Sequence, residues 1–272
     1  MNNEIVMSIF TGLLVLIGLA QVLILINQRR QNQLVLLQEY RQRWFEFRKQ
    51  WSIVIFIGRS EGEYYQVASS DVLTELTKLV EKSSDHEPTV WALESIRCVC
   101  NTLSDICIRV LQGQLEVRDV YPLFGTELLR QTLPLRILLD VYYQNDFSSH
   151  EENKHANILK ELQDWLIYHD GVRRRCLILI DLLWAEAVRL EDLSPVDIKR
   201  AAEAKVHSGK TSRNRLVSEL KKVNGKPCIF KALKLRAHLK YSEFSKSALQ
   251  RGINAAELDK RNEAWVNHIL RK

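Results

Sequence analysis

IVMSIFTGLLVLIGLAQVLILI, residues 5–26, is an uncharged apolar stretch, and it decides how the rest of the chain is organised. Glu4 precedes it, and Arg29 and Arg30 follow it. At about 1.5 Å per helical residue the stretch reaches roughly 33 Å, enough to cross a hydrocarbon core of about 30 Å. Fifteen of its residues are Ile, Val, Leu or Phe, whose transfer into lipid is favourable. The sequence therefore predicts a transmembrane helix.

The N-terminal stretch differs from a cleaved signal peptide in three ways. Residues 1–4 contain no Lys or Arg, and no small-residue cleavage site follows before Asn27. The apolar stretch is also longer than the usual 7 to about 15 residues. We therefore expect this segment to be kept as a membrane anchor.

Basic residues follow the anchor, whereas the only charged residue before it is acidic. The basic residues nearest to the anchor are Arg29, Arg30, Arg41, Arg43, Arg48 and Lys49. Because the basic side of a membrane span faces the cytoplasm, we expect a single-pass protein whose N-terminus lies outside. The bulk of the chain is then cytoplasmic, and the lipid bilayer is its first expected partner.

One face of the anchor carries small or weakly polar residues. On a helical wheel at about 100° per residue, Ser8, Thr11, Gly12 and Gly18 lie within roughly a third of the circumference. Small residues allow two helices to approach closely in lipid, and Ser8 and Gly12 form a small-xxx-small pair. This face predicts self-association, and a lone anchor with scattered small residues is the alternative.

The helix is expected to continue beyond the anchor, through residues 27–57. Large apolar residues recur there at alternating spacings of three and four: Leu37, Tyr40, Trp44, Phe47, Trp51 and Val54. Such a heptad pattern suits packing against a helical body or a second protomer, so Trp44 and Trp51 join the candidate oligomerisation residues. Residues 53–57 are apolar all round, and continuity with the heptads favours a buried helix over a strand.

Helical spacing also governs the rest of the chain, so the predicted class is all-α. Helices are expected at about 69–82 and 88–112, from Pro122 toward a polar loop at 145–149, at about 149–170 and 176–190, and in short pieces beyond 195. Gly113 is expected to end one of them, and Pro134 to kink or break another. We therefore predict an anchor at 5–26, a juxtamembrane helix at 27–57, a helical cytoplasmic domain at 58–194 and a basic helical module at 195–272.

Charge and cysteine content restrict the function. Residues 195–272 contain 19 Lys and Arg against 7 Asp and Glu, a net charge of +12, which suits RNA or an anionic lipid surface. The five cysteines have no C-x-x-C spacing, which fits buried thiols in a reducing cytoplasm. Residues 204–211 and 150–155 only loosely match a phosphate loop and a zinc-protease helix, so we expect neither a metal nor a cofactor.

Residues 92–139 carry a resemblance to a known group of proteins. The relevant segments are LESI at 93–96, IRVLQGQL at 108–115 and VYPLFG at 120–125. They resemble an uncharacterised family of bacterial proteins that have one N-terminal span and a helical cytoplasmic domain. The resemblance supports this architecture only, and it implies no activity. The uncharged span and the basic residues on one side of it predict a location in the bacterial inner membrane.

A second resemblance concerns a candidate catalytic motif near the C-terminus. RNEAWVNH, residues 261–268, resembles the Arg-polar-His motif of HEPN-type ribonucleases, which are all-helical and dimerise around RNA. In such a site Arg261 stabilises phosphate charge, Asn262 is the polar residue of the motif, and His268 transfers a proton without a metal. The alternative is a solvated last helix with Trp265 and Ile269 facing the core.

Residues 229–244 interleave basic and aromatic side chains. Lys231, Lys234, Arg236 and Lys240 are candidate nucleic-acid contacts, with nearby rings available for stacking. The alternative takes Ile229, Leu233, Ala237 and Phe244, at helical spacing, as core residues.

The leading interpretation is non-enzymatic. We expect a membrane-anchored interaction or assembly protein, a homo-oligomer with a further protein partner, of which a bacterial antiviral effector is one concrete form. The alternative function is a membrane-anchored, metal-independent ribonuclease that acts on RNA.

Cysteine-accessibility mapping tests the predicted topology. In a background without the native thiols, Asn2→Cys should react only with reagent outside the cell, and Lys272→Cys only with reagent in the cytoplasm. The physical reason is the one-sided cluster of basic residues. Labelling of position 2 from the cytoplasmic side alone would contradict the assignment.

Overall fold

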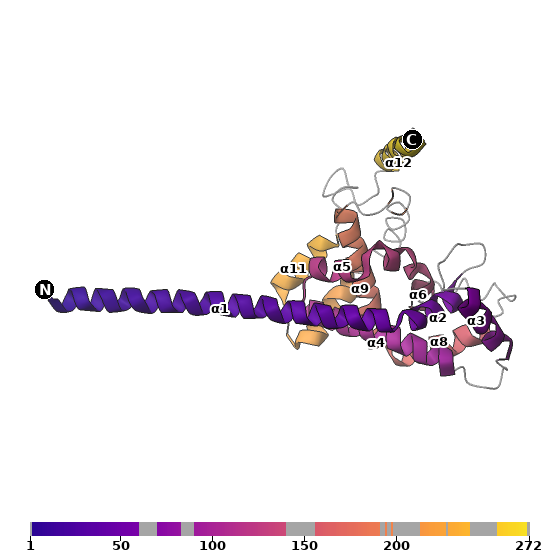
Figure 1. Ribbon diagram of the computed structural model, residues 1–272, viewed down its shortest axis with the longest axis horizontal. Helices are drawn as coiled ribbons and strands as arrows, with labels where there is room; N and C mark the ends of the chain where they lie inside the picture. Colours follow the sequence, from indigo (N-terminus) through magenta and orange to yellow (C-terminus); the bar gives the residue numbers. More distant parts are fainter. Residues whose placement is uncertain are drawn as a thin grey trace. The chain divides into compact units, whose positions relative to one another are not determined.

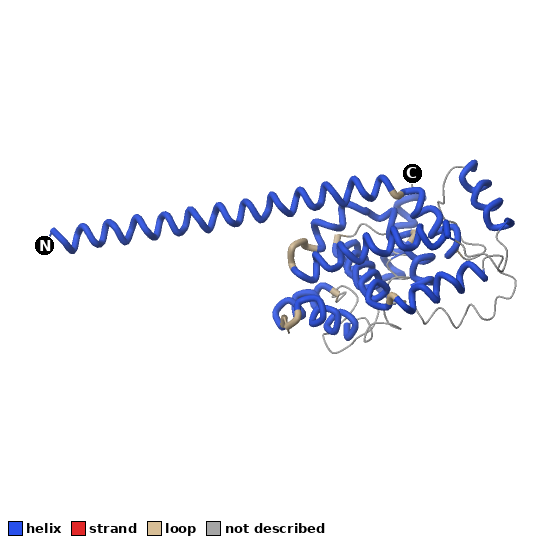
Figure 2. Tube along the Cα trace, turned by 90° about the horizontal axis from the view of Figure 1, so that it is seen from below, coloured by secondary structure: helices blue, strands red, loops and turns tan. Residues whose placement is uncertain are grey.

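The structure is a computed structural model that describes residues 2–59, 70–82, 90–139, 156–190, 194, 197, 213–226, 228–239 and 255–270. Every regular element in these ranges is a helix, and none of the described residues lies in a strand (Figure 2). The prediction of an all-α chain is therefore confirmed. By its internal contacts the chain divides into two compact units, Met1–Phe45 and Glu46–Lys272.

Helix α1, Asn2–Glu46, is one uninterrupted helix that contains the whole apolar stretch (Figure 1). Between Met7 and Ile26 its large apolar side chains are exposed, from 50% for Leu13 to 68% for Met7 and Leu14, whereas Tyr40 near its C-terminal end is buried at 3%. Among the described residues, α1 is the one helix that is long and apolar enough to cross a membrane. Its most apolar window has a mean hydropathy of 2.7. The helix also continues beyond Ile26, as the sequence predicts.

The expected continuous helix 27–57 is interrupted at Phe47. The backbone of Phe47 has φ −102° and ψ 24°, and α2, Arg48–Gly58, begins directly after it. The carbonyl of Phe47 still accepts a hydrogen bond from the N–H of Trp51 at 3.0 Å, so the ladder resumes at once. Heptad spacing does not reveal a turn of one residue, because the apolar positions on either side keep their separation. Residues 53–57 are helical and buried, as predicted.

Helix α9, Asp170–Arg189, lies at the centre of the second unit (Figure 1). It contacts α4 (Val90–Gln112), α5 (Val117–Arg130), α6 (Thr132–Leu139), α8 (Ala156–Tyr168) and α11 (Ile229–His238). Its segment 176–180 is buried on all sides. Such burial explains why this segment is apolar without a polar stripe.

Three cysteines belong to this core. Cys100 and Cys107 on α4 and Cys176 on α9 are buried free thiols, and the Cys176 Sγ lies 3.2 Å from the carbonyl oxygen of Cys100. Burial raises the pKa of the Cys107 thiol well above its usual range. Cys100, Cys107 and Cys176 are therefore apolar core residues, as expected, whereas Cys98 and Cys228 are half-exposed and depart from that expectation.

The predicted ends of two helices are also found. Gly113 has φ +77°, and the N–H of Gln114 bonds to the carbonyl of Arg109 at 2.9 Å, which closes α4 with a glycine C-cap. The break expected near Pro134 occurs at Gln131, between α5 and α6. Proline in the first turn of α6 loses no helical hydrogen bond. By contrast, the division expected at Gly171 lies at His169 instead, and Gly171 is inside α9.

The helix expected to open at Pro122 begins at Val117 instead, so Pro122 lies inside α5, and Gly125 interrupts α5 with φ 59° and ψ −165°. The helix expected at 149–170 is described from Ala156 to Tyr168, and its predicted start lies outside the described residues.

Among the described residues, the remaining predicted helices agree in type and approximate bounds. Helix α3 spans Ser70–Lys82, and the helices of the basic module are residues 213–224, α11 and α12 (Ala255–Leu270). The segments proposed for a phosphate loop, 204–211, and for a zinc-protease helix, 150–155, lie outside the described residues.

Gly58 marks the closest approach of α2 to α6, and its replacement provides a test of this packing. A Cβ at this position would lie 2.5 Å from the carbonyl oxygen of Pro134, which is backbone and cannot rotate away. We expect Gly58→Ala to lower the free energy of unfolding by about 1–3 kcal/mol, measured by urea denaturation of the detergent-solubilised chain.

Gly171→Ala is the matched control, because it is also helical and its new Cβ meets only the far end of the Arg175 side chain, at 3.2 Å. Its effect should be smaller than about 1 kcal/mol. Equal losses in the two variants would contradict the close helix contact.

Candidate functional site

The predicted catalytic residues lie on α12. His268 is exposed, and Asn262 is half-buried with its Oδ1 atom unpaired among the described residues. Arg261 is within the helix, but its side chain is not among those described. Arg261 and His268 are seven residues apart, so a helix places both on one face. Trp265, which the alternative places toward the core, is 44% exposed.

Helix α11 holds the predicted nucleic-acid contacts. Lys234 is exposed with its Nζ 3.7 Å from Glu116 Oε1, Arg236 is exposed, and Lys231 is half-buried. Lys240 lies outside the described residues. On a helical wheel Lys231 and Lys234 lie about 60° apart, whereas Arg236 lies roughly 140° or more from both, so Arg236 does not share their face.

The alternative core assignment for α11 is wrong for the residues that can be checked. Ile229 and Leu233 are 67% and 56% exposed, and Ala237 is also exposed. Leu235 and Leu239 are buried instead. Both faces of this helix carry apolar residues, so helical spacing alone could not distinguish the inner face from the outer one.

The predicted oligomerisation residues fall into two environments. Ser8 is exposed, Gly18 is half-exposed, and a Cβ added at Gly12 or Gly18 would meet nothing within 4 Å. Trp44 is half-buried, and Trp51 on α2 is buried at 8% exposure. The surface of Trp51 is thus mostly used within its own chain.

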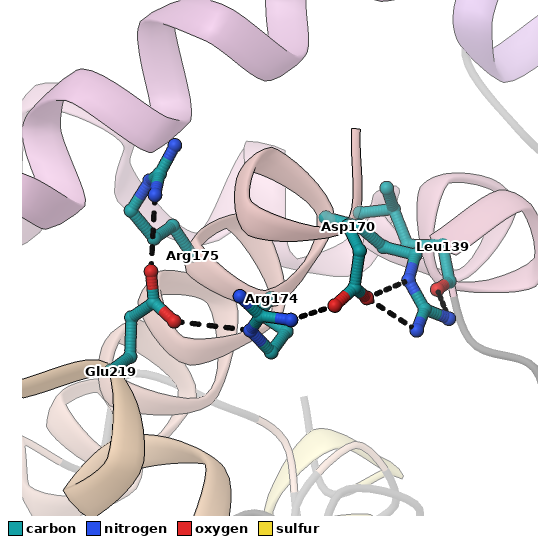
Figure 3. A network of polar contacts seen from close by, with 6 residues as sticks. Leu139, Asp170, Arg174, Arg175 and Glu219 are labelled. Atoms are coloured by element: carbon teal, nitrogen blue, oxygen red, sulfur yellow. Dashed lines mark hydrogen bonds and ion pairs between the residues drawn. The ribbon is translucent and has the colours of Figure 1, made fainter. Parts of the chain in front are cut away.

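Three consecutive arginines on α9 form a polar cluster that sequence reasoning missed, the arginine cluster of Arg173, Arg174 and Arg175 (Figure 3). Arg173 donates to Asp170 Oδ1 at 2.8 Å and to the Leu139 carbonyl at 3.2 Å. Arg174 pairs with Asp170 and, at 3.0 Å, with Glu219. The three arginine side chains are part-buried, with 19%, 25% and 20% exposure.

Glu219 is the buried centre of the cluster. Its side chain is 2% exposed, and its two oxygens each accept a hydrogen bond at 3.0 Å, one from Arg174 and one from Arg175. The Nε of Arg175 also donates to Ser104 Oγ on α4 at 2.7 Å. One carboxylate therefore joins the helix 213–224 to α9, and one arginine joins α9 to α4.

A second buried carboxylate lies near the other end of α9. Glu186 is 1% exposed, and its carboxylate accepts two hydrogen bonds from the Arg189 guanidinium, at 2.5 and 3.0 Å. His238 of α11 lies 3.4 Å from the same carboxylate. Hydrogen bonding from Arg189 lowers the pKa of Glu186, with a further contribution from the charge of His238. Glu186 is therefore ionised at neutral pH and holds α11 to α9.

The chemistry of these clusters favours a structural role. The carboxylates of Glu219 and Glu186 each accept hydrogen bonds from guanidinium groups, which satisfies their oxygens within the chain. No group of three or more His, Cys, Asp or Glu among the described residues is arranged to hold a metal ion. A sequence signal for the acidic residues did exist, because both interrupt apolar helical runs, LLWAEAV at 182–188 and LVSEL at 216–220.

Comparisons with models of known protein families, with curated proteins and with solved structures find no match to this chain. The two resemblances drawn from the sequence therefore stay predictions.

Substitution of Glu219 tests whether the arginine cluster holds the basic module to α9. We expect Glu219→Ala to lower the free energy of unfolding by about 2–3 kcal/mol, because it leaves two part-buried arginines without their carboxylate. Glu219→Gln should lose less, since its amide oxygen still accepts a hydrogen bond. Urea denaturation measures the effect.

The matched control is Glu116→Ala, which removes an exposed carboxylate that pairs with Arg118 at 2.9 Å and Lys234 at 3.7 Å. Exposed pairs contribute about 0–1 kcal/mol, so this variant should unfold nearly as the parent does. A loss for Glu219→Ala no larger than for Glu116→Ala would contradict the role of the cluster.

Proposed function

We propose that this protein is a membrane-anchored assembly protein, in which α1 holds a helical cytoplasmic body at the inner membrane and joins copies of the chain. The observation that carries the proposal is the exposure of α1. In its most apolar window, none of the residues is buried by the rest of the chain. A helix so apolar and so exposed needs lipid or other helices around it.

Association through α1 is supported by the free space around its glycines. A side chain added at Gly12 or Gly18 would touch nothing within 4 Å of its Cβ in the monomer. Packing within the chain therefore does not require glycine at these two positions. Close packing against a second membrane helix would require small residues there.

The helical body supports a binding role rather than a catalytic one. Its buried carboxylates, Glu186 and Glu219, hold helices together through arginines. Its buried thiols are apolar core residues. A body stabilised in this way supplies surfaces for a protein partner, and its chemistry at the described positions is structural.

Mass measurement in detergent tests the assembly. The parent chain should form an oligomer, and Gly12→Leu should weaken association by roughly tenfold or more, equivalent to about 1.4 kcal/mol, because leucine separates the helix backbones. Ala20→Leu is the matched control, since it adds the same side chain about 140° around the helix from the middle of the small-residue face. A monomeric parent, or equal effects of both variants, would refute assembly through this face.

A metal-independent ribonuclease is the second candidate, favoured by the exposure of His268 on α12. An exposed imidazole two turns from Arg261 is available to an RNA backbone, and dimerisation through α1 would raise the local concentration of a second pair.

RNA cleavage in the presence of EDTA tests the ribonuclease. If His268 transfers the proton, His268→Ala should lower the rate by about 10²- to 10⁴-fold. Asn267→Ala, an exposed neighbour, should cleave at the parental rate. Activity that is absent in the parent, or equal in the two variants, would exclude His268 as the catalytic group.

A further inference from the structure

The outward face of α11 is an apolar strip bordered by positive charge. Ile229, Phe230 and Leu233 are 67%, 90% and 56% exposed. On a helical wheel at about 100° per residue, these three and Ala237 span roughly 100°. Arg236 lies at one edge of this strip and Lys234 at the other, and both are exposed. We refer to these six residues as the α11 face.

The opposite side of α11 is already occupied by the body. Leu235 and Leu239 are buried, and His238 lies 3.4 Å from the buried carboxylate of Glu186. The Cβ position of Gly113 lies only 2.6 Å from the Lys231 Nζ, which places Lys231 against the end of α4. The helix is thus held by its inner face, and the α11 face is presented outward in a fixed orientation.

We propose that the α11 face docks on an anionic lipid surface. An apolar strip with Lys or Arg at both edges matches a helix that lies in the plane of a membrane interface. The apolar side chains enter the boundary of headgroups and acyl chains, and the long basic side chains reach back to the phosphates. The segment Ile229–His238 contains no acidic residue. The carboxylate of Glu116 on the neighbouring segment lies 3.7 Å from the Lys234 Nζ, and because that pair is largely exposed, lipid phosphates can compete for the lysine.

RNA and a second copy of the chain would each interact favourably with only some residues of the α11 face. RNA would pair with Lys234 and Arg236 and stack on Phe230, but it offers nothing for Ile229 and Leu233. A second copy of the face would cover the apolar strip, but it would bring the basic edges of both copies together. Anionic lipid satisfies the apolar and the charged groups at once.

Covalent attachment to α1 makes such docking effective even when the contact itself is weak. Residues 27–46 of α1 are helical and extend roughly 30 Å beyond the apolar stretch. A body that is covalently joined to a membrane helix meets lipid at a high effective concentration. This step rests on the membrane attachment proposed above.

Amide hydrogen exchange of the full chain in lipid vesicles tests the docking. We would compare vesicles of phosphatidylcholine alone with vesicles that also contain phosphatidylglycerol. Exchange in residues 229–238 should be slower in the anionic vesicles by at least about fivefold, the factor expected from one basic residue near an anionic surface. The double variant Phe230→Ser with Leu233→Ser should lose this difference, and because both positions are exposed its fold should be kept.

The matched control is Ile167→Ser with Tyr168→Ser on α8. These residues are also exposed, at 57% and 87%, but the exposed Glu161 and Asp164 lie beside them on the helix. Their replacement should leave exchange in α11 unchanged. Equal exchange in the two kinds of vesicle, or slowing that appears only when RNA is added, would overturn the proposal.

A separate experiment tests whether α1 spans the membrane. Vesicles that carry the protein are washed at alkaline pH, and flotation then measures how much protein stays bound. A chain without a membrane span would be washed off vesicles of either composition. Slower exchange of α11 in anionic vesicles before the wash would then still support docking. The two proposals therefore fail in different measurements.

Discussion

The contact of one buried carboxylate with two arginines holds the body of this protein together across distant parts of the sequence. Glu219 belongs to the basic module, whereas Arg174 and Arg175 belong to α9, the helix that contacts α4, α5, α6, α8 and α11. A carboxylate at 2% exposure is tolerated because both of its oxygens accept charge-assisted hydrogen bonds. The same bonds fix where the helix 213–224 lies against α9, since a misplaced carboxylate would be buried without partners.

Ion pairs of a buried carboxylate are found near both ends of α9. Near its start, Arg174 and Arg175 pair with Glu219. Near its end, Glu186 pairs with Arg189 and lies close to His238. Between these ends, the segment 176–180 is apolar and fully buried. Apolar burial supplies most of the favourable free energy of such a core, but it is not directional. The ion pairs at the two ends depend on the exact placement of their partners, so they fix the basic module against α9 at two defined points.

The packing of α11 against the body determines which of its residues are exposed. Because Leu235, Leu239 and His238 hold α11 by one side, its other side stays outward with Ile229, Phe230 and Leu233 exposed. The apolar residues of α1 are exposed as well. Two apolar surfaces that the chain does not cover are unusual for a protein that lives only in water, and both have the chemistry of lipid contact. Under our two proposals, the membrane is a partner both of α1 and of the body.

The sequence by itself determined the helical class, the apolar stretch of α1, the glycine end of α4 at Gly113 and the break near Pro134, because each depends on residues that are close in the chain. Local rules of spacing, capping and proline geometry suffice for such features. The turn at Phe47, the inner face of α11 and the partners of Glu219 were decided only by the tertiary structure. The choice between two apolar faces of one helix, and the pairing of residues 44 positions apart, depend on which helices meet in space, and no local pattern carries that information.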